Sequence, residues 1–136
     1  MGIYLLSGLL AATLAWVINN FIVVRLGKVP IFSLIPMVEE GLKTGLALFF
    51  RGSIFYTHLT FGLAEAILDV LRPGRSQVPA GIMGIISHGI YGWITTRVYV
   101  FTGNLWMAWA MSIVLHGLWN AGVIFLAPAK RNRNSP

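Results

Sequence analysis

Ionisable and amide side chains interrupt otherwise apolar segments of this sequence. They are Glu39, Glu40, Glu65, Asp69, His88, His116 and Asn120. A carboxylate in low-dielectric surroundings can act as a general base towards water, and histidine or amide groups can hydrogen-bond a developing oxyanion. Two histidines with carboxylates also form a ligand set that zinc accepts. These residue types predict hydrolysis by a water molecule that a carboxylate or a metal ion activates.

The spacing places several of these residues on shared helix faces, because side chains four residues apart occupy one side of a helix. Three pairs have this spacing: Glu39 with Lys43, Phe61 with Glu65, and His116 with Asn120. We expect Glu39 and Lys43 to pair. The HExxH spacing of helix-borne zinc proteases is absent from the sequence, so no cofactor is favoured. Zinc is the alternative, and its predicted ligands are Glu39, Glu65, His88 and His116.

Five apolar segments must position these side chains. They cover about residues 3–24, 33–50, 53–71, 79–101 and 105–127. The chain is 57% hydrophobic and 10% charged, whereas soluble domains are roughly 25% charged. Each segment approaches the ~20 residues that cross a bilayer as a helix. The sequence predicts one domain over residues 1–136, an all-α polytopic membrane bundle of about five transmembrane helices. Ser53 and Asn104 are predicted helix N-caps, and Gly103 a helix C-terminus.

Basic residues predict the orientation of the bundle. With the N-terminus outside, only Arg51 and Arg97 lie near the outer face, and seven basic residues lie near the inner face. These seven are Arg25, Lys28, Arg72, Arg75, Lys130, Arg131 and Arg133. The positive-inside rule therefore favours an N-out, C-in, multi-pass arrangement. The same topology in the lipid bilayer explains the net charge of +6, so no nucleic-acid partner is needed.

Charged residues within the segment 33–50 indicate a function, because an ionised side chain at a helix centre costs about 2.5–3.5 kcal/mol on insertion. This segment contains Glu39, Glu40 and Lys43, so it needs partners in a bundle or a wet cavity. At 1.5 Å per residue, the polar groups of four segments lie roughly 9–16 Å from the inner boundary. We therefore expect Glu39, Glu65, His88, His116 and Asn120 to meet at one level.

Two further ionisable residues are interpreted as interfacial. His58 lies ~20 Å from the inner boundary by the same count and is interpreted as an interfacial histidine. Asp69 lies near the inner interface, where Arg72 and Arg75 can neutralise it.

The motifs follow one another along the chain in a fixed order. Residues 39–43 match EExxK, residues 61–65 match FxxxE, His88 is a lone intramembrane histidine, and residues 116–120 match HxxxN. In this order they resemble the PrsW family of intramembrane proteases. That family belongs with the CAAX prenyl proteases and the bacteriocin-processing or immunity proteins (CPBP) in one superfamily. The resemblance extends over about residues 36–125.

The resemblance implies a role for each matching residue. Glu39 would activate the attacking water, with Glu40 beside it and Lys43 holding the pair in place. Glu65 occupies the position at which CAAX proteases carry a histidine, and Phe61 supports it. His88, His116 and Asn120 would bind the water or stabilise the oxyanion. Family members have been described both as metalloproteases and as glutamate proteases, so the resemblance leaves zinc open.

The combined prediction is an intramembrane endopeptidase of a prokaryotic cell membrane that cuts a membrane-anchored protein or peptide. Five spans are fewer than we expect for this superfamily, which leaves a homo-oligomer open. One alternative is a non-catalytic scaffold or bacteriocin-immunity-type protein with the same fold. The other is a proton- or cation-coupled transporter, since buried glutamate, histidine and lysine residues also form proton relays.

Overall fold

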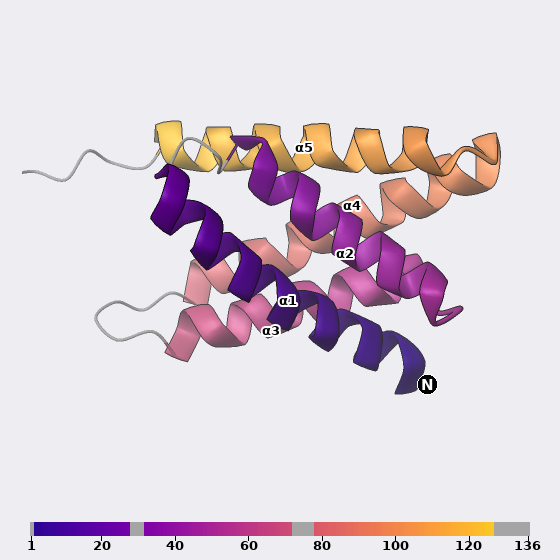
Figure 1. Ribbon diagram of the computed structural model, residues 1–136, viewed down its shortest axis with the longest axis horizontal. Helices are drawn as coiled ribbons and strands as arrows, with labels where there is room; N and C mark the ends of the chain where they lie inside the picture. The colour runs from indigo at the N-terminus through magenta and orange to yellow at the C-terminus, as the bar shows by residue number, and fades with distance from the viewer. Residues whose placement is uncertain (1, 28–31, 72–77, 127–136) are drawn as a thin grey trace, which may run out of the picture.

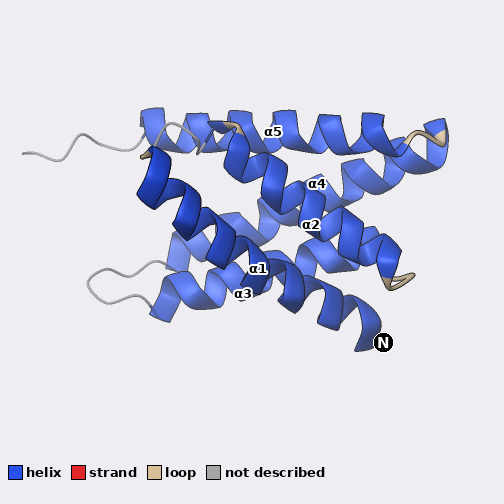
Figure 2. Cartoon of the chain, viewed as in Figure 1, coloured by secondary structure: helices blue, strands red, loops and turns tan. Residues whose placement is uncertain are grey.

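The computed structural model describes residues 2–27, 32–71 and 78–126, which form five α-helices without a strand (Figure 1). The helices are α1 (Gly2–Leu26), α2 (Leu34–Phe49), α3 (Ile54–Leu71), α4 (Val78–Thr102) and α5 (Leu105–Leu126). The predicted all-α fold is confirmed, and the predicted segments end within two residues of these bounds. Figure 2 shows short loops between α2 and α3 and between α4 and α5.

Local signals in the sequence account for three of the helix boundaries. Gly103 follows α4 with a φ of 64°, a left-handed conformation that glycine adopts without strain. The Asn104 side chain then accepts a hydrogen bond from the backbone N–H of Met107 at 3.1 Å. Ser53 Oγ accepts one from the backbone N–H of Tyr56 at 3.4 Å before α3. The predicted turn between α4 and α5 is therefore confirmed.

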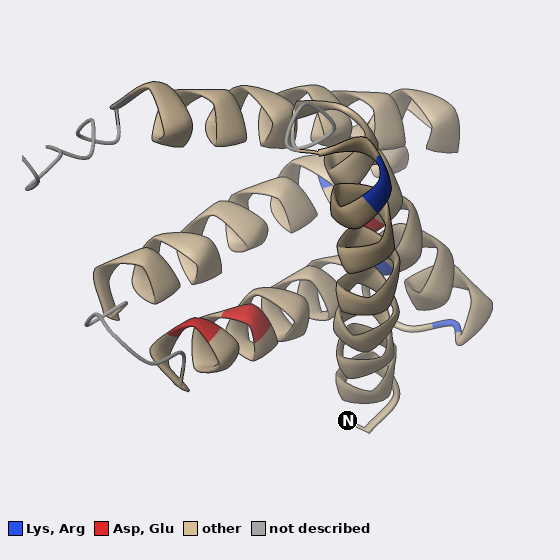
Figure 3. Ribbon diagram, turned by 60° about the vertical axis from the view of Figure 1, so that its left-hand side comes forward, with Lys and Arg blue, Asp and Glu red and all other residues tan. Residues whose placement is uncertain are grey.

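The helices pack in a definite order around the centre of the bundle. α3 and α4 form the most extensive contact, and α1 packs against both α2 and α3. α2 also contacts α3 and α5, and α5 packs on α4. From their shared turn, α4 and α5 diverge along their length (Figures 1 and 3). Residues of both helices line a groove that borders the site described below.

Glycines allow the close approach of α3 and α4. A Cβ atom at Gly62 would lie 2.9 Å from the Cβ atom of His88, and one at Gly92 would lie 2.6 Å from that of His58. A Cβ atom at Gly81 would lie 3.2 Å from the Cβ atom of Ala66. Small residues at helix contacts are typical of membrane bundles. They bring two histidines directly against the neighbouring backbone.

The distribution of polarity suits a lipid environment. Large apolar side chains point outwards, and Phe49, Phe101 and Phe125 are 78%, 80% and 82% exposed. Among the described residues, α1, α3 and Leu105–Phe125 of α5 are long and apolar enough to cross a membrane. α2 has only 16 residues, three of them charged. These features suggest a membrane protein, with three helices among the described residues that are suited to spanning the bilayer.

Candidate active site

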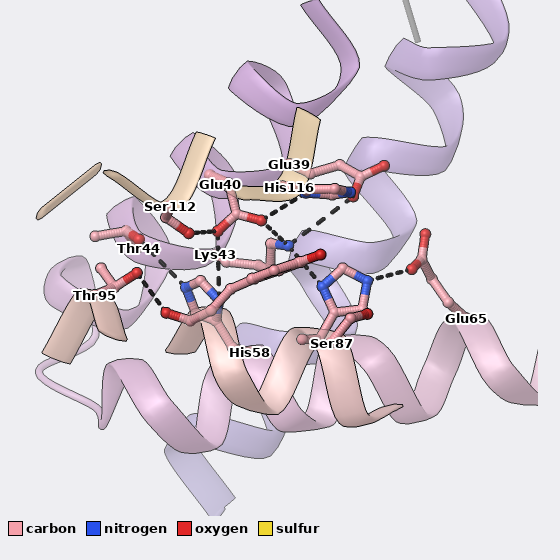
Figure 4. Close-up of polar contacts among 12 residues, drawn as sticks. Glu39, Glu40, Lys43, Thr44, His58, Glu65, Ser87, Thr95, Ser112 and His116 are labelled. Carbon is pink, nitrogen blue, oxygen red and sulfur yellow. Dashed lines mark hydrogen bonds and ion pairs between the residues drawn. The ribbon is translucent and has the colours of Figure 1, made fainter. Parts of the chain in front are cut away.

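Polar side chains from all five helices meet inside the bundle, and Figure 4 shows most of them. From α1 to α5 in order, they are Asn19; Glu39, Glu40 and Lys43; His58 and Glu65; His88; and Ser112 and His116. The predicted residues of α2, α3, α4 and α5 are thus brought together. Their burial is deep, since Glu40, Lys43 and His58 are completely enclosed.

Glu40 is the most fully coordinated side chain of the cluster. Its Oε1 accepts hydrogen bonds from Lys43 Nζ at 2.5 Å and from His116 Nδ1 at 2.8 Å. Its Oε2 accepts one from the Ser112 hydroxyl and lies 3.5 Å from His58 Nδ1. A buried carboxylate is stable only when it is paired and hydrogen-bonded in this way. Glu40 therefore organises three helices around itself.

Lys43 connects Glu40 of α2 with His88 of α4. Besides Glu40, its Nζ contacts His88 Nδ1 at 3.0 Å and lies 4.4 Å from the centre of the Phe61 ring. Glu39 Oε2 is 4.0 Å away, so the expected pairing of Lys43 with Glu39 is weaker than its pairing with Glu40. The face of an aromatic ring attracts a cation. Phe61 thus supports the position of this ammonium group.

The contacts of His88 determine which nitrogen of its ring carries the proton. An ammonium group only donates hydrogen bonds, so Nδ1 of His88 accepts from Lys43 and its proton lies on Nε2. Nε2 then donates to Glu65 Oε2 at 2.7 Å. The Glu65 side chain is 39% exposed, so Glu65 is more accessible than Glu39 and Glu40.

The same reasoning assigns the ring nitrogens of His116. A carboxylate only accepts, so Nδ1 of His116 carries the proton that is donated to Glu40. Its Nε2 lies 3.8 Å from Glu39 Oε2. A histidine whose one nitrogen is fixed by a carboxylate presents the other nitrogen in a fixed direction. Glu40 thereby aims His116 Nε2 towards Glu39.

Glu39 differs from Glu40 in having one oxygen without a hydrogen bond. Its Oε1 accepts a hydrogen bond from Asn19 Nδ2 of α1 at 2.8 Å. Its Oε2 is buried and makes no hydrogen bond with any described residue. Such an atom is expected to bind water or a ligand. The two oxygens of Glu39 therefore differ: Asn19 holds Oε1, and Oε2 makes no hydrogen bond with a described residue.

The cluster borders a groove of about 970 Å³ between α4 and α5. The ionisable, hydroxyl and amide residues that line it are Glu39, Glu65, Asp69, Ser87, His88, His116 and Asn120. Apolar side chains such as Met83 and Leu118 complete its walls. Every predicted catalytic residue except Glu40 thus borders one space. Within the described residues, no lysine or arginine lines this groove.

A divalent metal ion would fit part of this arrangement. One ligand atom each from Glu39, Glu65 and His88 lies within 4.8 Å of the other two. His116 Nε2 lies 3.8 Å from Glu39 Oε2 and could supply a fourth ligand atom. Carboxylate oxygens and imidazole nitrogens are the ligands of catalytic zinc sites.

The prediction that His58 is an interfacial histidine is wrong. His58 is 0% exposed, its Nε2 lies 3.4 Å from Thr44 Oγ1, and it faces Glu40. The count of residues along each segment assumed parallel helices, whereas the helices cross (Figure 1). Gly92 of α4 provides the space that the ring of His58 occupies.

The structure describes Asp69 but not the two arginines that were predicted to neutralise it. Asp69 lines the groove between α4 and α5 together with Glu65. Arg72 and Arg75, its predicted partners, lie outside the described residues.

Three polar partners of the cluster were not predicted from the sequence. Asn19 holds Glu39, Ser112 donates to Glu40, and Tyr91 stacks on His116 with ring centroids 5.1 Å apart. The position of Ser112, four residues before His116, was a usable signal because the two share a helix face. Asn19 offered only its amide within an apolar segment.

Comparisons of the chain with protein-family models, with curated proteins and with solved structures found no match. Its function is therefore inferred from the geometry of the site.

Proposed function

We propose that this protein is an intramembrane endopeptidase that hydrolyses a peptide bond of a membrane-anchored protein or peptide. The observation that carries the proposal is the Oε2 atom of Glu39, which makes no hydrogen bond with any described residue and lies 3.8 Å from His116 Nε2, on a residue that lines a large groove. A buried carboxylate oxygen without a partner is a costly arrangement. A catalytic base needs such an atom, whereas a purely structural network does not.

The distances support a mechanism with one activated water. The proposed attacking water hydrogen-bonds to both Glu39 Oε2 and His116 Nε2, which lie 3.8 Å apart. Glu39 takes a proton from this water as its oxygen bonds to the substrate carbonyl carbon, and the carbonyl oxygen becomes an oxyanion. When the carbon–nitrogen bond breaks, Glu39 returns the proton to the leaving amine nitrogen. The Asn120 amide, which lines the same groove, is the proposed donor to the oxyanion.

The remaining residues of the cluster position the reacting groups. Glu40 fixes the ring of His116, and Lys43 balances the charge of Glu40 and orients His88. His88 in turn holds Glu65 at the groove. With these residues in positioning roles and Glu39 as the base, we propose a glutamate-type mechanism. If a zinc ion binds, Glu39, Glu65, His88 and His116 would hold it, and it would supply a more acidic bound water.

The finer topology belongs to the same proposal. We place all five helices across a prokaryotic cell membrane, with the N-terminus outside and the C-terminus inside. Among the described residues, Arg25 lies in the last turn of α1, which this topology places inside. Arg51 follows the C-terminal end of α2, which the topology places outside. Glu39 is five residues from the start of α2, or ~8 Å along its axis. The reacting groups would thus lie in the inner half of the bilayer.

The test uses the full chain in liposomes with a library of single-span peptides that carry a fluorophore and a quencher at opposite ends. We expect cleavage by the unmodified protein and a fall on the order of 10²–10⁴-fold in Glu39→Gln, the range that general bases contribute. Glu39→Gln should keep the same thermal stability, because its amide oxygen still accepts from Asn19. Thr13→Val is the control, since the Thr13 hydroxyl binds only its own helix backbone. Cleavage by Glu39→Gln at the unmodified rate would overturn the proposal.

The same liposomes distinguish the other interpretations. A pH gradient that collapses without any peptide cleavage would favour a proton-coupled transporter. Unfolding of Glu39→Gln in the absence of any cleavage by the unmodified protein would favour a structural network. Loss of cleavage with a chelator, and its recovery with zinc, would replace the glutamate mechanism by the metal-dependent one.

A further inference from the structure

A second groove reaches the site from the opposite side of α3. It lies between α1 and α3 and has a volume of about 270 Å³. Asn19 and Asn20 of α1, together with Glu65 and Asp69 of α3, form its polar lining. Glu65 and Asp69 also line the groove between α4 and α5. The two grooves therefore approach the same carboxylates from two sides of the bundle.

The polarity of this second groove is local and does not extend along the two helices. Further along α1 and α3 lies a groove of about 420 Å³ that is lined by Leu9, Thr13, Ile67 and other largely apolar residues. Trp16 borders both spaces. The polar part thus occupies the end of the α1–α3 contact near Asn20. A volume of 270 Å³ far exceeds the ~10–15 Å³ that one water molecule requires.

Asn19 connects this groove to the proposed base. Its Nδ2 donates to Glu39 Oε1 at 2.8 Å, and its Oδ1 is buried without a hydrogen bond to any described residue. Ordered water typically satisfies a buried amide oxygen that has no protein donor. The unpartnered Oε2 of Glu39 lies on the same carboxylate. Asn19, which lines the second groove, and Glu39 are thus joined by one hydrogen bond, and each keeps a buried acceptor without a protein donor among the described residues.

We infer that the groove between α1 and α3 is a hydrated entrance that supplies water to Glu39, and that Asn19 is a positioning residue at its inner end. The inference rests on the proposed function. Hydrolysis consumes one water per turnover, and a peptide in the groove between α4 and α5 would cover the site from that side. A separate polar entrance allows water to reach Glu39 while the substrate is bound.

Cysteine labelling tests the entrance independently of any activity. The chain contains no cysteine, so a single introduced thiol has no background. Asn20→Cys places it in the polar groove. Thr13→Cys places it two helical turns away on α1, also exposed but in the apolar groove. In liposomes, a charged methanethiosulfonate should label Asn20→Cys at least about tenfold faster, since only a hydrated thiol ionises to the reactive thiolate.

Kinetics test the role of Asn19. Asn19→Leu removes the donor to Glu39 and fills the inner end with an apolar side chain. We expect kcat to fall on the order of 10²-fold with KM unchanged, because substrate binds elsewhere and a misplaced base slows chemistry. Asn19→Ser, which leaves room for a bridging water, should recover part of kcat. Thr13→Leu on the same helix should keep both constants.

The outcomes separate the entrance from the proposed function. Equal labelling of Asn20→Cys and Thr13→Cys would overturn the entrance even if the protein cleaves peptides. Fast labelling of Asn20→Cys in a protein that cleaves nothing would support the entrance and overturn the peptidase. An effect of Asn19→Leu on KM alone would place Asn19 in substrate binding and overturn its positioning role.

Discussion

Glu39 and Glu40 are neighbours in the sequence but face different surroundings, because consecutive side chains on a helix point about 100° apart. Glu40 points into the bundle, where Lys43, His116 and Ser112 donate to it. Glu39 points towards the groove between α4 and α5 and keeps one oxygen without a partner. A chemical role is therefore best sought at Glu39, and a structural role at Glu40.

The ion pair of Lys43 with Glu40 should be strongly coupled to folding. Lys43→Met leaves Glu40 enclosed without its cation, and removal of one partner of a buried pair costs about 3–5 kcal/mol. The double variant Glu40→Gln/Lys43→Met removes both charges and should recover much of this loss. Unfolding of the protein in bilayers or mixed micelles measures these free energies.

Arg97→Met is the matched control for this substitution. Arg97 is exposed and lies 5.7 Å from the Trp93 ring, a contact worth about 0.5–1 kcal/mol. If the double variant were less stable than Lys43→Met alone, the charge of Glu40 would not be the reason for the loss.

At the scale of elements, the sequence predicted the helices well and their contacts less well. Apolar segments and the turn at Gly103 determine where the helices run, because both signals are local. The meeting of Glu39, Glu65, His88 and His116 could be expected because isolated charges in hydrocarbon are costly. His58 and Asn19 could not be placed, since their positions depend on helix crossing angles that residue counts along one helix do not contain.

The glycines of the α3–α4 contact give a prediction at this scale. In Gly62→Ala the new methyl group would lie 2.9 Å from the Cβ atom of His88, so the two helices must separate. Overpacking of this kind costs about 1–3 kcal/mol. The same shift would displace His88 from Lys43 and Glu65, and activity should fall with stability.

Gly84→Ala on α4 is the control, because nothing lies within 4 Å of its added Cβ atom. It should stabilise the protein by up to about 1 kcal/mol through helix propensity. Thermal unfolding of both variants compares the two effects. A Gly62→Ala protein as stable as Gly84→Ala would show that α3 and α4 do not approach as closely as described.

At the scale of the whole molecule, polarity is arranged with apolar side chains outside and ions inside. Phe101 and Phe125 face outwards, whereas the charged side chains of α2 are buried. This arrangement could be expected from composition alone, because 10% charged residues cannot cover a globule in water. The number of crossings does not follow from composition, since α2 is short and charged.

The proposed orientation can be measured with single thiols in the same cysteine-free background. Thr102→Cys lies at the end of α4 and Leu26→Cys at the end of α1, which the proposal places on opposite sides of the membrane. A membrane-impermeant maleimide applied to intact cells should label Thr102→Cys at once and Leu26→Cys only after permeabilisation. The reverse pattern would invert the topology, and labelling of both in intact cells would mean that α1 to α4 do not cross as proposed.

The way Glu40 is enclosed has a consequence for biosynthesis. Its partners Ser112 and His116 follow it by 72 and 76 residues, so they are synthesised well after α2. During that interval Asn19 of α1 and Lys43 can bind the carboxylates of α2, but Glu40 lacks its donors from α5, which makes transfer of α2 into lipid costly. Once α5 is present, Ser112 and His116 can donate to Glu40, and the helices would then enter the bilayer together. Assembly of this protein would then be a late, collective event, and nascent chains that stop short of α5 would be substrates for cellular quality control.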